Sequence, residues 1–288
     1  MKELIGTGTA LITPFKSDYS IDFNALEAIV NHQIENGTNY FVVLGTTGES
    51  ATLSKDEKRQ VIDCIKSANA GRLPLVLGIG GNDTARVHDE FQNTDLNGFC
   101  AILSVSPYYN KPNQEGIYRH YKTLADDSPL PIIIYNVPGR TGSNMTADTQ
   151  LRLGLHPNIV ATKEASGNME QIMKIIACKT SDFMVISGDD ALTFPLIAAG
   201  AQGVISVINH AFPKEFSGMV QTALNGNLVA ARYMHYPLLE AAVEIFADGS
   251  PGGIKVMLNE MGLCETTVRP PLYGVNPQVE QKLRKLIR

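Results

Sequence analysis

Lys163 is the residue whose type and position point most directly to chemistry. It ends the apolar run Ile159–Lys163, and the turn-forming residues Ser166 and Gly167 follow shortly after it. Burial at the end of a strand disfavours the ammonium form and lowers the pKa of a lysine, and a neutral lysine amine attacks carbonyl carbons to form Schiff bases. The alternative is a lysine whose head group simply reaches water. The choice between the two depends on whether other segments of the chain form a pocket around this amine.

A second apolar run ends in the sequence Gly-Thr-Thr-Gly at residues 45–48, followed by Glu49 and Ser50. The backbone N–H groups and hydroxyls of such a turn can hold a small carboxylate. A tight turn that only begins the next helix is the alternative.

A third apolar run ends at Tyr135, and Arg140 follows it by five residues. A tyrosine at a strand end can relay protons beside a Schiff base, and an arginine can bind a carboxylate through two parallel hydrogen bonds. The alternative is a proline-shaped turn with a surface arginine.

Two further strand ends carry polar or aromatic residues. Tyr108 and Tyr109 are adjacent, so their side chains point in different directions; one can anchor an interface while the other reaches a site, or both are ordinary loop aromatics. Gly188 follows another run and Gly203 begins the last one. Because Gly203 precedes its run, we disfavour a phosphate site there and expect this strand to line the pocket instead.

Eight short apolar runs alternate with longer amphipathic segments and position these residues. The runs are Thr9–Pro14, Tyr40–Leu44, Leu75–Ile79, Cys100–Val105, Pro131–Tyr135, Ile159–Lys163, Phe183–Ser187 and Gly203–Val207. The helical segments are Phe23–Asn36, Ser54–Ala70, Thr84–Leu96, Gln114–Ala125, Ala147–Leu153, Met169–Cys178, Ala191–Ala199 and Pro213–Leu224. This alternation predicts an α/β fold of the (β/α)8 TIM barrel type. A doubly wound sheet is disfavoured because Gly6-Thr7-Gly8 precedes the first strand and no GxGxxG motif follows it.

The carboxyl ends of barrel strands meet on one face, where barrel active sites form. Lys163, Tyr135 and the residues 45–48 are therefore expected to converge. Successive side chains of a strand face opposite sides, so a Lys163 that points into the barrel mouth leaves Glu164 pointing away from it. Glu164 is then not its salt-bridge partner.

Beyond Gly226 the pattern is helical, over Leu228–Phe246, Gly253–Met261 and Gln278–Ile287. We predict a catalytic barrel over residues 1–226 and a C-terminal extension of three helices over residues 227–288.

Composition excludes several classes of function. Hydrophobic residues make up 44% of the 288 residues, the net charge is −5, and there is no basic block, which argues against a nucleic-acid partner. The apolar stretches are too short to span a membrane, and the N-terminus does not resemble a signal peptide. The six histidines show no metal-ligand spacing. The four cysteines form no CxxC pair, which is typical of reduced thiols in a cytoplasmic protein.

The strand-end motifs together resemble the dihydrodipicolinate synthase family, within the pyruvate-dependent class I aldolases that also include N-acetylneuraminate lyase. The resemblance covers the whole barrel and extends into the C-terminal helices. The motifs that carry it are Gly45–Leu53, Pro107–Asn110, Tyr135–Pro138 with Arg140–Gly142, Lys163–Ala165 and Ser187–Asp190. It implies a lyase that condenses pyruvate with L-aspartate 4-semialdehyde on the diaminopimelate route to lysine, with a covalent Schiff base and no separate cofactor or metal.

The resemblance also implies a role for each site residue. Lys163 would form the imine, Thr47 would hold the pyruvate carboxylate, and Gly188 and Ile205 would line the pyruvate pocket. Tyr135 would be the general acid and base, linked through Thr46 to Tyr109 from a neighbouring subunit. Arg140 would bind the carboxylate of the semialdehyde. The family is a homotetramer, or a dimer in some members, and the shared tyrosine requires at least a dimer.

Three further readings follow from the resemblance. Arg140 favours the synthase over N-acetylneuraminate lyase and other aldolases of 2-keto-3-deoxy sugar acids. A non-catalytic binding or regulatory homologue is disfavoured by the intact lysine, tyrosine and arginine. The asparagine-proline pattern of many relatives is replaced here by Gly249–Lys255, which affects the C-terminal region and not the barrel chemistry.

The lysine-inhibited relatives carry an allosteric pocket at positions that match Ser50, Ala51, Asn82 and Tyr108. An acidic residue there holds the amine of the inhibitor, whereas this chain has Arg86, together with Lys55 and Lys58 nearby. Cations repel a ligand ammonium, so we predict weak or absent inhibition by lysine.

Overall fold

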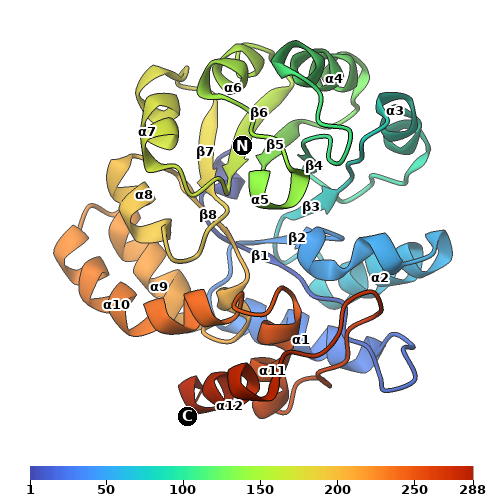
Figure 1. Ribbon diagram of the computed structural model, residues 1–288, viewed down its shortest axis with the longest axis vertical. Helices are drawn as coiled ribbons and strands as arrows, with labels where there is room; N and C mark the ends of the chain where they lie inside the picture. Colours follow the sequence, from blue (N-terminus) through green and yellow to red (C-terminus); the bar gives the residue numbers. More distant parts are fainter. Residues whose placement is uncertain (288) are drawn as a thin grey trace.

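Eight parallel strands close into a barrel in the computed structural model, which describes residues 1–287 (Figure 1). The strands are β1 Gly6–Ala10, β2 Tyr40–Val43, β3 Leu75–Gly78, β4 Ala101–Val105, β5 Ile132–Asn136, β6 Ile159–Glu164, β7 Met184–Ser187 and β8 Gly203–Ser206. Each strand pairs with the next one in the sequence, and β8 closes on β1. The predicted (β/α)8 fold is confirmed.

Most of the strands are apolar runs because both of their faces are buried; β1, with the sequence Gly-Thr-Gly-Thr-Ala, is an exception. One face fills the barrel interior, where Val42, Leu103 and Ile133 belong to a single apolar cluster. The other face packs on the surrounding helices, through residues such as Phe41 and Ile132. A strand-end side chain on the first face therefore points into the barrel mouth.

The helices follow the predicted segments closely. Around the barrel lie α1 Phe23–Glu35, α2 Lys55–Asn69, α3 Thr84–Asn93, α4 Gln114–Asp127, α6 Ala147–Leu153, α7 Met169–Cys178, α8 Thr193–Ala199 and α9 Pro213–Leu224. The capping box that the sequence predicts at Ser54 is present, with Glu57 as the reciprocal residue. Short elements that the sequence did not predict are the single turn α5 Pro138–Thr141 and four 3₁₀ turns, of which η2 Thr46–Gly48 and η3 Ser50–Thr52 lie beside the site.

The first strand is the one whose predicted position was wrong. β1 begins at Gly6 and ends at Ala10, so the glycines that we placed before the strand lie inside it. A Cβ on Gly8 would lie 2.2 Å from the Tyr40 ring, and one on Gly203 would lie 2.1 Å from the Gly6 carbonyl oxygen. Close packing at this end of the barrel therefore requires glycine, and the turn signal of the glycines was misleading.

Three helices follow the barrel: α10 Leu228–Glu244, α11 Gly252–Glu260 and α12 Pro277–Leu286. Helix α10 packs against α8 and α9, and α12 packs against α10 and α11 (Figure 1). Among residues 227–287 no strand is present. The division of the chain at residue 226 stays a prediction.

Candidate active site

Lys163 lies on β6 and projects into the mouth of the barrel. In the sheet register it pairs with Tyr135 on β5 and with Ile186 on β7. Its side chain is 6% exposed, and its Nζ lies 4.3 Å from the centre of the Tyr135 ring. The alternative interpretation, a lysine whose head group reaches water, is therefore wrong.

Burial sets the electrostatics of this amine. Desolvation lowers the pKa of Lys163 to about 8; the Asp190 carboxylate opposes this shift, and the Arg140 guanidinium adds to it. With that pKa roughly one amine in ten is neutral at pH 7, against fewer than one in a thousand for an unperturbed lysine. Nucleophilic amine is thus available near neutral pH.

Tyr135 is the nearest proton carrier. It is 7% exposed, and its burial raises the pKa of the phenol to about 12, although Arg140 and a hydrogen bond with Thr46 act in the opposite direction. The phenol consequently stays protonated until a reacting group draws its proton away. Its contacts with Lys163 and Thr46 bring three of the predicted residues together.

The Gly-Thr-Thr-Gly segment is a 3₁₀ turn directly after β2. Thr46 and Thr47 open this turn, where N–H groups have no partner within the helix, and Thr47 is 7% exposed. The turn lies between two non-glycine residues in the left-handed region, Leu44 with φ 57° and Glu49 with φ 52°. A backbone held in this disfavoured conformation is typical of a binding turn.

Gly188 and Ile205 border the amine on the β7 and β8 side. A Cβ on Gly188 would lie 2.9 Å from Cε of Lys163 and 2.8 Å from Cβ of Ala165, so glycine makes room for the lysine side chain. Ile205 is 1% exposed and belongs to the same interior cluster as Tyr135. Both residues therefore shape the space around Nζ.

Arg140 lies on α5, the single turn that follows β5, and its side chain is solvent-exposed. It is close enough to Lys163 and Tyr135 to affect both of their pKa values. An exposed guanidinium at the mouth can meet an incoming carboxylate that the buried residues cannot reach.

Tyr109 is the predicted residue that the single chain does not bring into the site. It has φ 71° and is 86% exposed. Its backbone N–H donates to the Thr141 carbonyl, with a distance of 3.3 Å between the nitrogen and the oxygen. Within residues 1–287 no contact joins its ring to Thr46, so the predicted relay is not closed within one chain.

The residues of the predicted allosteric pocket are partly contiguous. Asn82 donates from its side chain to the Tyr108 carbonyl, with Nδ2 3.2 Å from the oxygen, while Ser50 and Ala51 lie on η3. Arg86 is exposed and lies 3.4 Å from Asp83; an ion pair between exposed side chains is weak and leaves the guanidinium charged.

Asp190 is a site residue that the sequence reasoning did not single out, although it lies within the Ser187–Asp190 motif. It is 3% exposed, and burial raises the pKa of its carboxyl to about 6. Its Oδ2 accepts from the backbone N–H groups of Val207 and Ile208, at 3.0 and 2.8 Å, while Oδ1 has no hydrogen-bond partner among the described residues. The pair of acidic residues Asp189 and Asp190, which follows the end of a predicted strand, was the sequence feature that could have indicated this site.

Glu164 points away from Lys163, as predicted, and it has an environment that the sequence did not indicate. Its carboxylate is fully buried and accepts from the side-chain amides of Asn136 and Gln150, each at 2.6 Å, and from the hydroxyl of Ser166 at 2.5 Å. These contacts join the ends of β5 and β6 behind the reactive residues.

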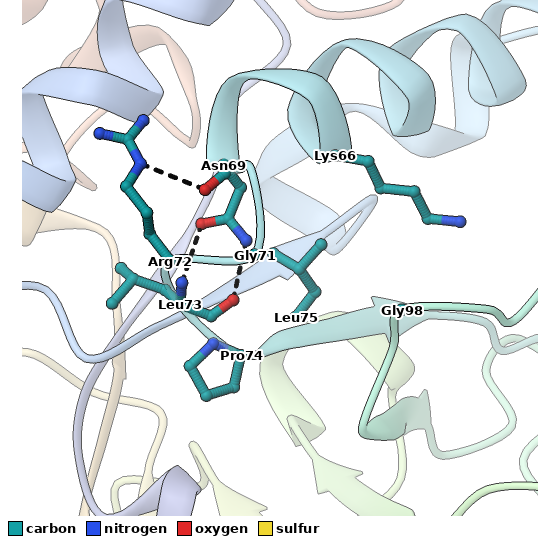
Figure 2. Close-up of a pocket in the computed structure, with 8 residues that line it drawn as sticks. All are labelled: Lys66, Asn69, Gly71, Arg72, Leu73, Pro74, Leu75 and Gly98. Carbon is teal, nitrogen blue, oxygen red and sulfur yellow. Dashed lines mark hydrogen bonds between the residues drawn. The ribbon is translucent and has the colours of Figure 1, made fainter.

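A cavity of about 510 Å³ lies at the end of the barrel opposite to Lys163, where β3 begins (Figure 2). Two cationic residues, Lys66 and Arg72, line it together with Pro74 and Gly98. Both have partners: Lys66 lies 3.6 Å from Asp95, and Arg72 donates to the Asn69 carbonyl at 3.2 Å. It has no part in the chemistry of Lys163.

Other classes of site find no support in residues 1–287. No group of three or more His, Cys, Asp or Glu side chains is arranged to hold a metal ion. No helix in the described part of the chain is long and apolar enough to cross a membrane.

Comparisons with known proteins agree with this geometry. The model of the dihydrodipicolinate synthetase family matches residues 3–288. The 4-hydroxy-tetrahydrodipicolinate synthase of Flavobacterium psychrophilum is 54% identical over 98% of this chain and 97% of its own length. The crystal structure of dihydrodipicolinate synthase from Aquifex aeolicus is similar with a TM-score of 0.94 and 40% identity, and covers 99% of this chain and 97% of that one.

A structure of the Acinetobacter baumannii dihydrodipicolinate synthase, described as complexed with pyruvate, has a TM-score of 0.96 and 38% identity, over 99% of this chain and 98% of that one. Full-length matches at this level of identity extend from the barrel into the C-terminal helices. The chain therefore belongs to the dihydrodipicolinate synthetase family.

Proposed function

We propose that this chain is a lyase that condenses pyruvate with L-aspartate 4-semialdehyde to give 4-hydroxy-tetrahydrodipicolinate, on the diaminopimelate route to lysine. The observation that carries the proposal is the buried Lys163 amine, with its pKa lowered to about 8, beside the Tyr135 ring at the barrel mouth. The relatives of the same length that carry this enzyme name support the choice of reaction.

The first step joins Lys163 to pyruvate. The neutral amine attacks the keto carbon, the carbinolamine loses water, and a protonated imine remains. The imine draws electrons from the adjacent methyl group, which loses a proton and becomes an enamine carbon. Because the protein's own imine provides this electron sink, the proposed reaction needs no metal or cofactor.

The turn at residues 45–48 would hold the carboxylate of pyruvate while the imine forms. Thr47 is buried at the opening of η2, where backbone N–H groups and a hydroxyl can point at one oxygen pair. Gly188 accommodates the Lys163 side chain, and Ile205 would pack against the pyruvyl carbon atoms.

Tyr135 would carry the protons of these steps. Its phenol has a pKa of about 12 and is therefore a donor at neutral pH, which suits protonation of the carbinolamine hydroxyl before water leaves. The hydrogen bond with Thr46 gives the proton a route away from the buried site. In the second half of the reaction the same phenol would protonate the aldehyde oxygen as the new carbon–carbon bond forms.

Arg140 would select the second substrate. Its exposed guanidinium can bind the carboxylate of the semialdehyde through two hydrogen bonds and leave the aldehyde facing the enamine. After the condensation, the amino group of the substrate attacks the imine carbon and releases the Lys163 amine. We expect Arg140→Met to raise KM for the semialdehyde at least tenfold, with KM for pyruvate changed much less.

The proposal includes a homo-oligomer, at least a dimer and in keeping with the family a tetramer. Within the single chain Tyr109 is 86% exposed, so the relay proposed between Tyr109 and Thr46 requires a second copy of the chain. Packing of Tyr109 against a second copy would bring its phenol to the other copy's Thr46. We further propose that the enzyme works in the cytoplasm, where its four free thiols stay reduced.

A coupled assay with both substrates tests the function. Turnover of pyruvate with L-aspartate 4-semialdehyde, and none with N-acetylneuraminate or 2-keto-3-deoxy sugar acids, supports the proposal. Turnover of a sugar acid in place of the semialdehyde would make the chain a different aldolase of the same group. Failure of both reactions, with pyruvate bound reversibly and no covalent adduct, would identify a non-catalytic homologue.

A further inference from the structure

A buried ion pair connects the η2 turn, residues 46–48, to the C-terminal extension. Lys255 on α11 places its Nζ 2.6 Å from Oε1 of Glu49, the residue that directly follows η2. The two side chains are 0% and 1% exposed. The residues are 206 positions apart in the sequence, so the contact links the start of the barrel to the end of the chain.

Each polar atom of this pair has a specific partner. The other carboxylate oxygen of Glu49 accepts from the backbone N–H of Arg269 at 2.9 Å. Lys255 also donates to the Thr267 carbonyl at 2.8 Å, and its Nζ lies 4.4 Å from the centre of the Phe15 ring. Burial lowers the pKa of Lys255, and Glu49 opposes this shift. The charges are matched and the hydrogen bonds are satisfied, so the pair is a built contact.

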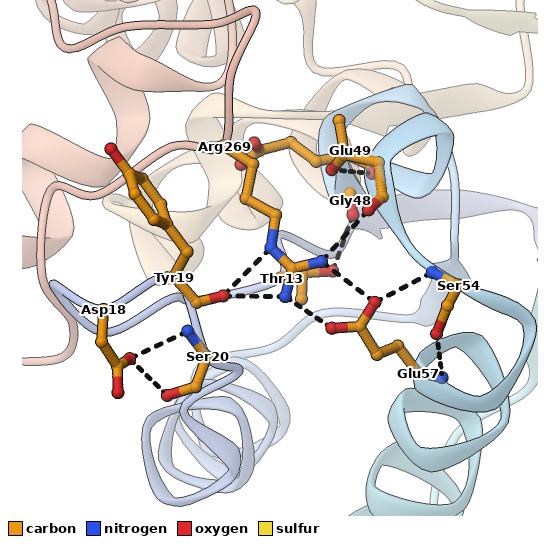
Figure 3. A network of polar contacts seen from close by, with 10 residues as sticks. Thr13, Asp18, Tyr19, Ser20, Gly48, Glu49, Ser54, Glu57 and Arg269 are labelled. Atoms are coloured by element: carbon orange, nitrogen blue, oxygen red, sulfur yellow. Dashed lines mark hydrogen bonds and ion pairs between the residues drawn. The ribbon is translucent and has the colours of Figure 1, made fainter.

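Arg269 extends the same attachment to the neighbouring elements, as Figure 3 shows. Its guanidinium donates to both carboxylate oxygens of Glu57 on α2 and to the carbonyls of Thr52 and Tyr19, at 3.1 Å and 2.7 Å. The segment after α11 therefore holds Glu49, the end of η3 and the first turn of α2 together.

The pair acts on the turn through the backbone of Glu49. The Glu49 N–H donates to the Thr46 carbonyl at 3.1 Å, and its φ of 52° is in the left-handed region that favours glycine. Gly48 is fixed on the other side, since its carbonyl accepts from the Thr13 hydroxyl at 2.7 Å. The Glu49 backbone thus connects its buried side chain directly to the Thr46 carbonyl.

A purely structural role explains these observations less well. Buried ion pairs are weak contributors to stability, because apolar residues of the same volume often serve as well. A buried ion pair can instead fix one defined geometry, as a buried polar residue fixes the register of a coiled coil. Here that geometry belongs to the residue adjoining the proposed carboxylate-binding turn.

We propose that Glu49, Lys255 and Arg269 form a clamp through which the C-terminal extension positions the pyruvate-binding turn. The clamp residues are positioning residues and do not touch substrate. The inference rests on the proposed function, since it takes residues 46–48 as the seat of the pyruvate carboxylate. It assigns the helical extension a part in the active site, beyond covering the barrel.

The test uses the double variant Glu49→Gln/Lys255→Met in the full chain. Lys255→Met alone leaves a buried carboxylate without a counter-charge and can prevent folding, whereas the double variant removes both charges together. We expect KM for pyruvate to rise roughly tenfold, because a displaced turn loses a hydrogen bond to the pyruvate carboxylate and such a loss is about a tenfold effect. KM for the semialdehyde should stay within about twofold. Hydrogen exchange at residues 44–52 should become faster.

Arg284→Met is the matched control. Arg284 also joins elements of the extension, through Glu280 and Glu260, but contacts no residue of the turn. The Arg284→Met variant should have a lower melting temperature, with unchanged KM for pyruvate and unchanged hydrogen exchange at residues 44–52. If the double variant behaves in this same way, the clamp is only structural and the proposal is overturned; a rise in KM without faster exchange at residues 44–52 overturns it equally.

The failure of the proposed function would look different. In that case the unmodified protein itself forms no covalent adduct with pyruvate at Lys163. The clamp is judged by comparing the double variant with a fully active unmodified protein.

Discussion

Replacement of Lys163 by methionine is predicted to stabilise the protein at neutral pH while it abolishes activity. Desolvation lowers the pKa of this lysine from 10.5 to about 8, so the folded state binds a proton there less tightly than the unfolded state. The buried ammonium therefore lowers the free energy of unfolding. This destabilisation is fully present below pH 8 and disappears as the pH rises to about 10.5. Methionine has a similar length and removes the charge that causes this cost.

The size of the effect follows from the shift. One pKa unit corresponds to about 1.4 kcal/mol, so the 2.5 units between 10.5 and about 8 amount to roughly 3 kcal/mol. The ammonium also gains about 1 kcal/mol from the Tyr135 ring, at 4.3 Å from its centre, and methionine loses this gain. A net stabilisation of about 2 kcal/mol at pH 7 remains, which raises the melting temperature by roughly 3 °C for a chain of this size.

Differential scanning calorimetry from pH 6 to pH 10, at equal protein concentrations, measures this difference. Titrating groups that do not interact with Lys163 are common to both proteins and cancel. Asp190 does interact with it, but its pKa of about 6 leaves the carboxyl mostly ionised over most of this range. Lys163→Met should melt at a higher temperature at pH 6–7, and the two curves should converge as the pH approaches 10. A variant that is less stable at pH 7, or a difference that does not change with pH, would refute the burial argument for Lys163.

Three further predictions concern neighbouring residues. Asp190→Asn removes the carboxylate that holds the pKa of Lys163 up, so the acidic limb of the pH profile of kcat/KM for pyruvate should move to lower pH; a move to higher pH contradicts this assignment. Tyr109→Phe and Lys163→Met should each be nearly inactive. If Tyr109 crosses the interface, a mixed and reassembled sample should recover up to about a quarter of the activity, because one site of each mixed dimer has both residues intact. No recovery would place the relay elsewhere. Inhibition by lysine should be weak in the coupled assay because of the Arg86 position, and strong inhibition at submillimolar lysine refutes this.

The strands were predictable because burial on both faces leaves a simple signal in the sequence. Seven of the eight apolar runs overlap their strands almost residue for residue, and the helices between them begin at cap residues such as Ser54. The first strand was displaced because Gly6 and Gly8 resemble a turn, whereas they serve close packing at the base of the barrel. Local composition does not contain that long-range contact.

The reactive residues were predictable for a similar reason. Side-chain alternation separated Lys163 from Glu164, and the strand ends carried Tyr135 and the threonine turn to one face. Asp190 and the clamp of Glu49 and Lys255 were missed because they depend on contacts between distant segments. A lysine in the first turn of a predicted helix gives no local indication that it is buried against a turn 206 residues away.

Reduction with borohydride in the presence of pyruvate tests the central claim most directly. Mass spectrometry of the digested protein should find the reduced pyruvyl adduct on the peptide that contains Lys163 and on no other lysine peptide, with a yield that rises with pH through about 8. Lys163→Met should give no adduct under the same conditions. Absence of the adduct on Lys163 in the unmodified protein, or its presence on another lysine, would contradict the account of this site.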